Sequence, residues 1–131
     1  MTTPRKPRLY VLNSPIIPIK NETECTAIVT RTKDLNFIKS ELRHYLFNIG
    51  YELISAIGHE STAILLSQLL ELEIKTNRIA IELAEDDIAI AFTLEFRLPE
   101  GKVLSKEELE NIINEKKFSF TIIKIDTCWE I

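Results

Sequence analysis

The sequence contains very little glycine, methionine, tryptophan and histidine. Its 131 residues include 3 Gly, 1 Met, 1 Trp and 2 His. We find no internal repeat, no low-complexity tract and no second domain. Because 45% of the residues are hydrophobic, the chain can bury a core of its own without metal ions or disulfide bonds. We therefore expect one domain over residues 8–131, preceded by a flexible tail over residues 1–7.

Long apolar runs and an excess of positive charge are also absent. No segment reaches the length of a membrane span, and the N-terminus lacks the apolar core of a signal peptide, so we expect a soluble, cytoplasmic protein without membrane contact. The chain has 16 Lys and Arg against 20 Asp and Glu, a net charge of −4. This balance argues against binding of duplex DNA by bulk electrostatics. Arg5, Lys6 and Arg8 are interrupted by Pro4 and Pro7, which is typical of a solvated tail.

The two cysteines do not form a ligand pattern. Cys25 and Cys128 lie far apart, and neither has the Cys-x-x-Cys or Cys/His spacing of a zinc site or a redox motif. We expect no metal ion and no other cofactor. A disulfide bond between them remains an open alternative, since intracellular proteins of some hyperthermophiles carry such bonds.

Three helices are predicted from capping residues and apolar spacing. The first follows Asp34, a residue type that caps helix N-termini, and Gly50 is placed to end it in a left-handed conformation. The second follows Gly58 and is apolar on more than one face, which indicates burial in the fold or in a dimer interface. The third begins with the capping box Ser105-Lys106-Glu107-Glu108.

Strand patterns alternate with these helices. Apolar, β-branched and aromatic runs predict five strands, over residues 8–13, 25–30, 77–83, 88–98 and 118–125. The acidic Glu85-Asp86-Asp87 turn joins the third and fourth strands, and this short connection predicts an antiparallel hairpin. The order of the elements predicts an α/β fold, a single domain in which helices flank a mixed central β-sheet of about five strands.

The run Ser-Ala-Ile-Gly-His-Glu-Ser-Thr-Ala at residues 55–63 has the features of a phosphate site. A helix start presents backbone N–H groups without partners, and such groups bind anions. Gly58 allows the backbone to approach a ligand closely. His59 adds an imidazole, the side chain whose ordinary pKa lies nearest neutrality and which can therefore deliver a proton. These features together indicate a site that binds phosphate and transfers a proton.

Each candidate residue also has an ordinary structural explanation. The same run is typical of a simple helix N-terminus with a hydroxyl cap, an early acid and a histidine that packs. An isolated Arg97 before a proline is commonly a strand end with a surface ion pair, and Arg78 alone is no more specific. His44 lies within the first helix, where a lone histidine is usually solvated or packed, and Lys102 is typical of an exposed turn.

Four short motifs taken together resemble one protein family. They are Leu-Asn-Ser-Pro at 12–15, Ala-Ile-Gly-His-x-Ser-Thr at 56–62, Asn-Arg at 77–78 and Arg-Leu-Pro-Glu-Gly-Lys at 97–102. Their order and spacing are similar to those of the viral ring nucleases, small α/β proteins of archaeal viruses and phages that act as type III anti-CRISPR proteins. The resemblance implies a homodimer that cuts cyclic tetra-adenylate into linear di-adenylates with 2',3'-cyclic phosphate ends, without a metal.

Motifs and resemblance together define the candidate site. The implied catalytic residues are His59, Arg97 and Glu100, and the ligand-binding residues are Asn13, Ser14, Ile57, Gly58, Ser61, Thr62 and Arg78. Relatives place a serine three residues after the asparagine, where this chain has Ile16. Ser14 therefore takes over that contact, or the contact is absent.

The chemistry of RNA cleavage agrees with these roles. Attack by the 2'-hydroxyl needs in-line geometry, charge stabilisation on the phosphoryl oxygens and a proton for the departing 5'-oxygen. His59 fits the proton donor, and Arg97 fits the phosphate through its planar fork. Glu100 either orients the imidazole, which we prefer, or acts as the base. An isologous dimer would present such a site twice to a two-fold symmetric ring.

Two other classes of function remain alternatives. A protein that binds or senses cyclic oligoadenylate without cleaving it would need the same ligand contacts, and product analysis with a labelled ring would separate it from an enzyme. A viral DNA-binding or interaction protein on the same fold would be expected to carry a basic recognition helix, which we do not find. A gel-shift assay with duplex DNA tests that alternative.

Overall fold

A mixed five-stranded sheet with the strand order β2-β5-β4-β1-β3 forms the centre of the fold. The computed structural model describes residues 5–98 and 103–131. The strands are β1 (Arg8–Leu12), β2 (Thr23–Thr32), β3 (Glu52–Ser55), β4 (Ile88–Leu94) and β5 (Phe118–Glu130). The helices are α1 (Leu35–Arg43), continued by the π-helix η1 (His44–Ile49), α2 (Glu60–Leu70) and α3 (Lys106–Glu115). The expected α/β fold, with helices flanking a mixed five-stranded sheet, is confirmed.

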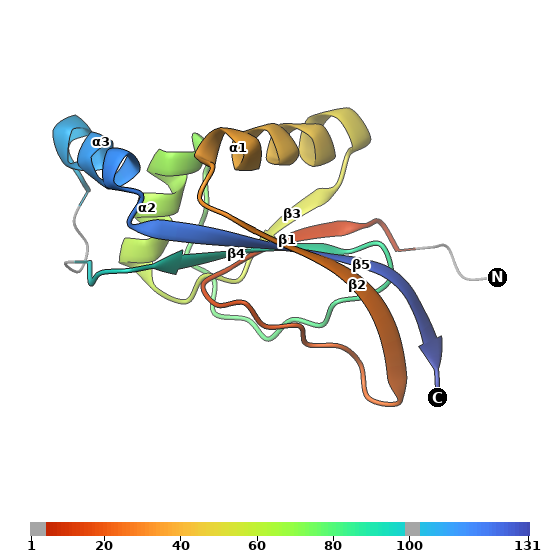
Figure 1. The fold of residues 1–131 in the computed structure, drawn as a ribbon. Coiled ribbons are helices and arrows are strands. Elements are labelled where there is room, and N and C mark those ends of the chain that lie inside the picture. Colours follow the sequence, from red (N-terminus) through yellow and green to blue (C-terminus); the bar gives the residue numbers. More distant parts are fainter. Residues whose placement is uncertain (1–4, 99–102) are drawn as a thin grey trace.

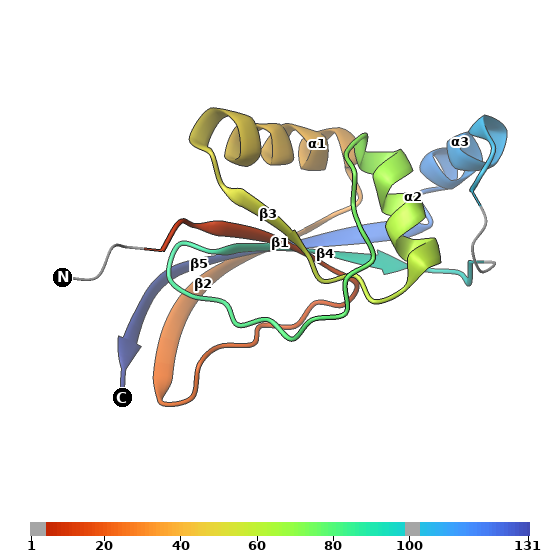
Figure 2. The same cartoon turned by 180° about the vertical axis from the view of Figure 1, so that it is seen from behind.

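The two faces of the sheet are covered differently. All three α-helices lie on one face, and the connection over residues 13–22 and the later part of the connection 71–87 run across the other (Figures 1 and 2). Because successive side chains of a strand point to opposite faces, β1 and β4 supply both cores. The helix-side core includes Leu9, Val11, Ile90, Phe92 and Phe120. The core under the connections includes Tyr10, Leu12, Ala89, Ala91 and Ile123.

Strand β1 lies between two parallel neighbours. Val11 is in register with Ser55 of β3 on one side and with Ile90 of β4 on the other. Parallel strands end at the same edge of a sheet, so the segments that leave β1, β3 and β4 are brought to one place. Strand β5 runs antiparallel to both β4 and β2 and takes no part in this common edge.

The expected strand over residues 77–83 and its hairpin with residues 88–98 are wrong. Among the described residues, the connection 71–87 forms two isolated parallel β-bridges, Ile57 with Thr76 and Ile19 with Leu83, and no strand. Leu83 is 2% exposed and packs onto the core under the connections. Apolar alternation in this segment therefore reflects packing across the sheet face. Strand β4 pairs with β1 in parallel and with β5 antiparallel, and it ends at Leu94.

One strand is not predicted from the sequence, and two predicted strands are longer than expected. Strand β3 has only four residues, between Gly50 and Gly58, which is too short for a periodic pattern. Strand β2 covers Thr23–Thr32, and β5 continues past residue 125 to Glu130. The C-terminal end of β5 is polar and shows no apolar alternation. It is a strand because it pairs with β2.

The predicted helix boundaries are confirmed at three caps. The Asp34 carboxylate accepts a hydrogen bond from the Phe37 backbone N–H at 3.1 Å, and Ser105 forms the complete capping box of α3. Gly50, with a φ of 96°, ends η1 in the left-handed region. In the part of the chain that the structure describes, no helix is long and apolar enough to cross a membrane.

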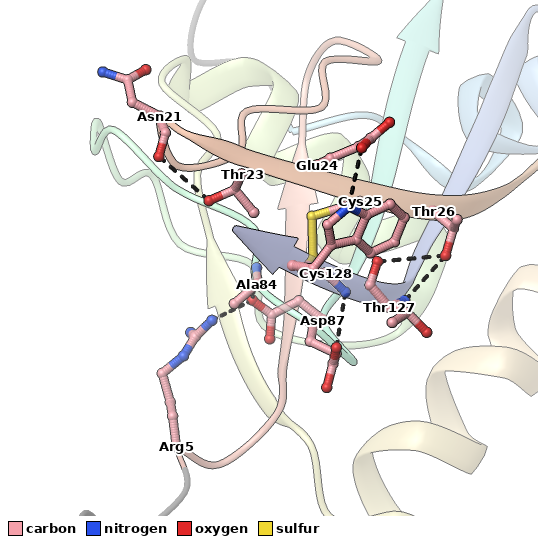
Figure 3. The surroundings of a disulfide bond; sticks show 12 residues. Arg5, Asn21, Thr23, Glu24, Cys25, Thr26, Ala84, Asp87, Thr127 and Cys128 are labelled. Carbon is pink, nitrogen blue, oxygen red and sulfur yellow. Dashed lines mark hydrogen bonds and ion pairs between the residues drawn. A yellow bond between two sulfur atoms is a disulfide. The ribbon is translucent and has the colours of Figure 1, made fainter. Parts of the chain in front are cut away.

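A disulfide bond joins Cys25 of β2 to Cys128 of β5 (Figure 3). The two residues are in register, next to an irregularity of the pairing between Cys25 and Ala27. This end of the β2–β5 pair bends away from the other strands on the side opposite the helices (Figure 1). The Trp129 indole N–H also donates to the Glu24 carboxylate across the pair, at 3.1 Å. Covalent and polar cross-strand contacts thus hold an end of the sheet that no helix covers.

We expect the double substitution C25S/C128S to lower the free energy of unfolding by about 2–4 kcal/mol, because the bond closes a long loop in the unfolded chain. Guanidinium chloride titration of both proteins measures the difference. Wild-type protein kept under a reducing agent is the matched control. It should unfold at the same guanidinium chloride concentration as the double variant. Equal stability of the oxidised wild type and the variant would contradict this role of the bond.

The carboxylate of Asp87 is the most deeply buried charge among the described residues, with 1% of the side chain exposed. It accepts hydrogen bonds from the Arg5 guanidinium at 2.5 Å, from the Arg8 backbone N–H at 3.1 Å and from the Ala84 backbone N–H at 2.9 Å. These contacts join the starts of β1 and β4 and the turn before β4. Arg5, in the segment expected to be flexible, is thus attached to the sheet (Figure 3).

Asp87→Asn should lower the free energy of unfolding by about 2–3 kcal/mol, because an amide cannot accept from all three donors and leaves buried groups unpaired. Asp86→Asn is the matched control. Asp86 is exposed and has a φ of 71°, a conformation that asparagine tolerates, so its change should stay within about 0.5 kcal/mol. A urea titration measures both changes. Equal, small changes in the free energy of unfolding would show that the Asp87 contacts do not stabilise the fold.

Candidate functional site

The turn between β3 and α2 crosses the common edge of the parallel strands. The Ala56 backbone N–H donates to the Val11 carbonyl at 2.9 Å, so the chain still follows β1 after β3 has ended. Ile57 is completely buried, and its N–H donates to the Ser55 hydroxyl at 3.3 Å. Its carbonyl accepts from the Asn77 backbone N–H at 2.8 Å. The predicted ligand contact Ile57 therefore lies inside the fold and anchors the turn.

Residues 75–78 lie alongside this turn and are bonded to it. The Ser55 hydroxyl donates to the Lys75 carbonyl at 2.6 Å. The Asn77 side-chain amide donates to the Ser55 carbonyl at 2.7 Å. Together with the backbone bond from Asn77, these contacts fix the position of the Asn-Arg motif relative to the end of β3.

Arg78 contacts the glycine of the predicted phosphate motif. Its Nε–H donates to the Gly58 carbonyl at 2.7 Å. A Cβ atom built on Gly58 would lie 3.3 Å from Cγ of Arg78, which is tighter than ordinary contact. Gly58 is therefore a place of close approach, as its position in the motif predicts, but in this structure the group that approaches it is the side chain of Arg78.

His59 is the N-cap residue of α2. It has extended backbone angles, with φ −119° and ψ 127°, and its carbonyl accepts from the Ala63 N–H at 3.1 Å. The His59 side chain is exposed and makes no capping hydrogen bond. A hydroxyl cap, the ordinary explanation of this motif, is thus not what the structure has. His59 thus directly precedes the first backbone N–H groups of α2, which have no acceptor within the helix.

Arg97 reaches the same place from a different element. It lies three residues beyond the end of β4, whose arrowhead ends beside α2 in both views (Figures 1 and 2). A pocket of about 360 Å³ is lined by His59, Ser61, Thr62, Leu94, Phe96, Arg97 and Leu98. Four of the predicted site residues therefore meet in one pocket, although they come from two segments more than thirty residues apart in the sequence.

Other predicted residues lie near this pocket or outside the described residues. Asn13 and Ser14 directly follow β1, at the edge shared with the β3–α2 turn, and Asn13 is exposed. They do not line the pocket. Glu100 and Lys102 fall outside residues 5–98 and 103–131, so their part in the site stays a prediction.

Comparison with known proteins identifies relatives of the whole fold. A family model described as STIV B116-like matches residues 9–120. The chain belongs to the STIV B116-like family. It is 41% identical over 105 residues to protein 26 of a Sulfolobus islandicus filamentous virus, covering 79% of this chain and 83% of the relative. It is 34% identical over 107 residues to ORF117 of the Acidianus two-tailed virus, covering 79% and 85%, respectively. Both relatives carry the name uncharacterized protein.

A solved structure of the family has the same architecture. B116 of Sulfolobus turreted icosahedral virus superposes with a TM-score of 0.71 at 28% identity, covering 88% of this chain and 97% of B116. A bacterial relative also occurs, YddF of Bacillus subtilis, with 38% identity over 76 residues, covering 58% of this chain and 67% of that protein. The chain is thus a member of a family of small proteins found in archaeal viruses, and its fold is that of B116.

In this member of the STIV B116-like family, the two arginines near the pocket are available to an anion. Arg78 and Arg97 are both exposed, and neither is ion-paired with any residue of 5–98 or 103–131. Glu60, also exposed, lies in the first turn of α2. Over the same ranges, no three His, Cys, Asp or Glu side chains are grouped as a metal site would require.

Several residues shape the site of this B116-like protein without a functional signal in the sequence. Leu94, Phe96 and Leu98 form the apolar wall of the pocket and pack against the helix-side core. Their alternation predicts a continuing strand, whereas β4 has already ended. Ser55 and Asn77 belong to motifs of the sequence, but their role in positioning the β3–α2 turn could not be predicted, because their partners are backbone groups about twenty residues away.

Proposed function

We propose that this protein is a metal-independent ring nuclease that binds cyclic tetra-adenylate and cuts it into linear di-adenylates with 2',3'-cyclic phosphate ends. The observation that carries the proposal is the pocket that joins His59 to Arg97, with Ser61 and Thr62 beside them. An exposed imidazole, a guanidinium and the first N–H groups of a helix are suited to a phosphodiester. Relatives in archaeal viruses support a role in switching off type III CRISPR signalling, as an anti-CRISPR protein.

The proposed reaction uses only groups of the substrate and the chain, with solvent water as a possible proton acceptor. The 2'-oxygen of one adenosine attacks the neighbouring phosphorus, the new P–O2' bond forms and the P–O5' bond breaks. His59, as imidazolium, gives its proton to the departing 5'-oxygen, and the 2'-hydroxyl proton passes to solvent or to Glu100. Arg97 and the α2 N–H groups stabilise the charge on the phosphoryl oxygens. Glu100 is assigned to orientation of the imidazole in preference to the role of base.

Local charge allows an acidic chain to bind a polyanion. The net charge is −4, so long-range attraction does not favour the ring. Arg78, Arg97 and the N-terminus of α2 instead place positive charge and N–H donors at one edge of the sheet. Compact cyclic substrates present their phosphates close together, which suits such a small positive site better than it suits a long duplex.

A two-fold dimer would complete the proposed enzyme. Cyclic tetra-adenylate can be two-fold symmetric, so two copies of the His59 pocket can act on opposite phosphates of one ring. Light scattering after gel filtration should then give about 30 kDa, twice the 15.1 kDa of one chain. A mass of one chain, unchanged when the ring is added, would contradict the dimer. Cleavage by a single site is tested separately by the cleavage assay.

Wild-type protein incubated with labelled cyclic tetra-adenylate and a chelator should release di-adenylate with a cyclic phosphate end. His59→Ala should slow single-turnover cleavage by about 10²-fold or more and leave ring binding nearly unchanged, because general acid catalysis is lost. Arg97→Ala should weaken both binding and cleavage. Reaction quenching with product separation by chromatography measures the rates.

His44→Ala is the matched control, since it removes the other histidine, in η1, away from the pocket. It should react like the wild type. Equal rates for His59→Ala and wild type would rule out His59 as the acid. Ring binding without any product would support a sequestering or sensing protein, and preferential binding of duplex DNA in a gel-shift assay would contradict the proposed substrate.

A further inference from the structure

The guanidinium of Arg78 forms a hydrogen bond to the protein backbone. Nε–H donates to the Gly58 carbonyl at 2.7 Å, although the side chain is exposed and near the proposed ring site. The bond attaches this part of the Arg78 side chain to the β3–α2 turn. We propose that Arg78 is a positioning residue, which holds the Gly58–His59 peptide and so directs the His59 imidazole toward the scissile phosphate. The inference rests on the proposed function.

The bond reaches His59 through the rigid geometry of the peptide group. The Gly58 carbonyl and the His59 N–H belong to one planar unit, so fixing the oxygen fixes the direction in which the His59 backbone starts. The His59 side chain is exposed and makes no capping bond, so it does little to restrain its own backbone. On the other side of the residue, the His59 carbonyl accepts from the Ala63 N–H at 3.1 Å. The direction in which the His59 side chain leaves the backbone therefore depends on the peptide group that Arg78 holds.

Arg78 is itself held firmly enough to act on its neighbour. The preceding residue, Asn77, donates through its backbone to Ile57 at 2.8 Å and through its side chain to Ser55 at 2.7 Å. Three hydrogen bonds from two consecutive residues thus meet the β3–α2 turn at Ser55, Ile57 and Gly58. A misplacement of about 1 Å at a reacting group can reduce a rate by about 10²-fold, so such restraint matters for catalysis.

Substitution by lysine separates positioning from charge. Lysine keeps the positive charge that would attract a phosphate, but it has a methylene group where arginine has Nε, so it cannot donate to Gly58 in the same place. Arg78→Lys should therefore reduce single-turnover cleavage by about tenfold or more, while ring affinity changes by less than about threefold. Arg43→Lys is the matched control, because Arg43 lies on α1 with its side chain 70% exposed, and it should change neither value.

A double-mutant cycle tests the contact from the side of Gly58. Gly58→Ala places a methyl group 3.3 Å from Cγ of Arg78 and should displace the guanidinium, so it should slow cleavage as Arg78→Lys does. Alanine at residue 78 has no Cγ. In an Arg78→Ala background, Gly58→Ala should therefore slow cleavage by less than about twofold further. Fully multiplicative effects of the two substitutions would overturn the contact as the cause.

Hydrogen exchange in the ligand-free protein provides a readout that does not depend on activity. The Ala63 N–H, which bonds to the His59 carbonyl, should exchange at least about tenfold faster in Arg78→Lys and Gly58→Ala than in Arg43→Lys. Unchanged exchange overturns the proposal, whether or not the wild type cleaves the ring. A wild type that leaves the ring intact contradicts the proposed function alone. Equal loss of affinity and rate in Arg78→Lys would instead make Arg78 a ligand contact.

Discussion

The buried carboxylate of Asp87 determines where the two central strands begin. By binding the Arg8 backbone N–H, it sets the start of β1 beside the start of β4, and the parallel register of Leu9 with Ile88 follows. Parallel pairing on both sides of β1 then brings the ends of β1, β3 and β4 to one edge. An interaction at one edge of the sheet thus decides which residues meet at the opposite edge, where the proposed site lies.

The proposed site combines rigid and exposed parts. His59 and Arg97 are exposed side chains, whereas the turn and the wall that carry them are anchored by the buried Ile57 and the half-buried Phe96. Reactive groups gain a fixed place in this way without losing access to a ligand. Helix α2 serves both purposes, since its first turn faces the pocket while Leu65, Leu66 and Leu69 are buried in the helix-side core.

Local features of the fold could be predicted from the sequence, and long-range features could not. The caps at Asp34, Gly50 and Ser105 depend on residues within one helical turn, so local patterns identify them correctly. Alternation over residues 77–83 predicts a strand because packing across a sheet face and pairing within a sheet produce the same pattern. Family motifs indicate His59 and Arg97, but the bond between Arg78 and Gly58 could not be foreseen, since its acceptor is a backbone carbonyl.

The connection over residues 71–87 replaces a helix layer on its face of the sheet, and this has a consequence for how the protein can evolve. Leu83 closes the core beneath it, while Asn77 and Arg78 hold the turn that carries His59. An insertion between these residues would disturb folding and chemistry at once. We therefore expect this loop to tolerate substitutions at exposed positions such as Glu82 better than changes of length, which surface loops normally tolerate.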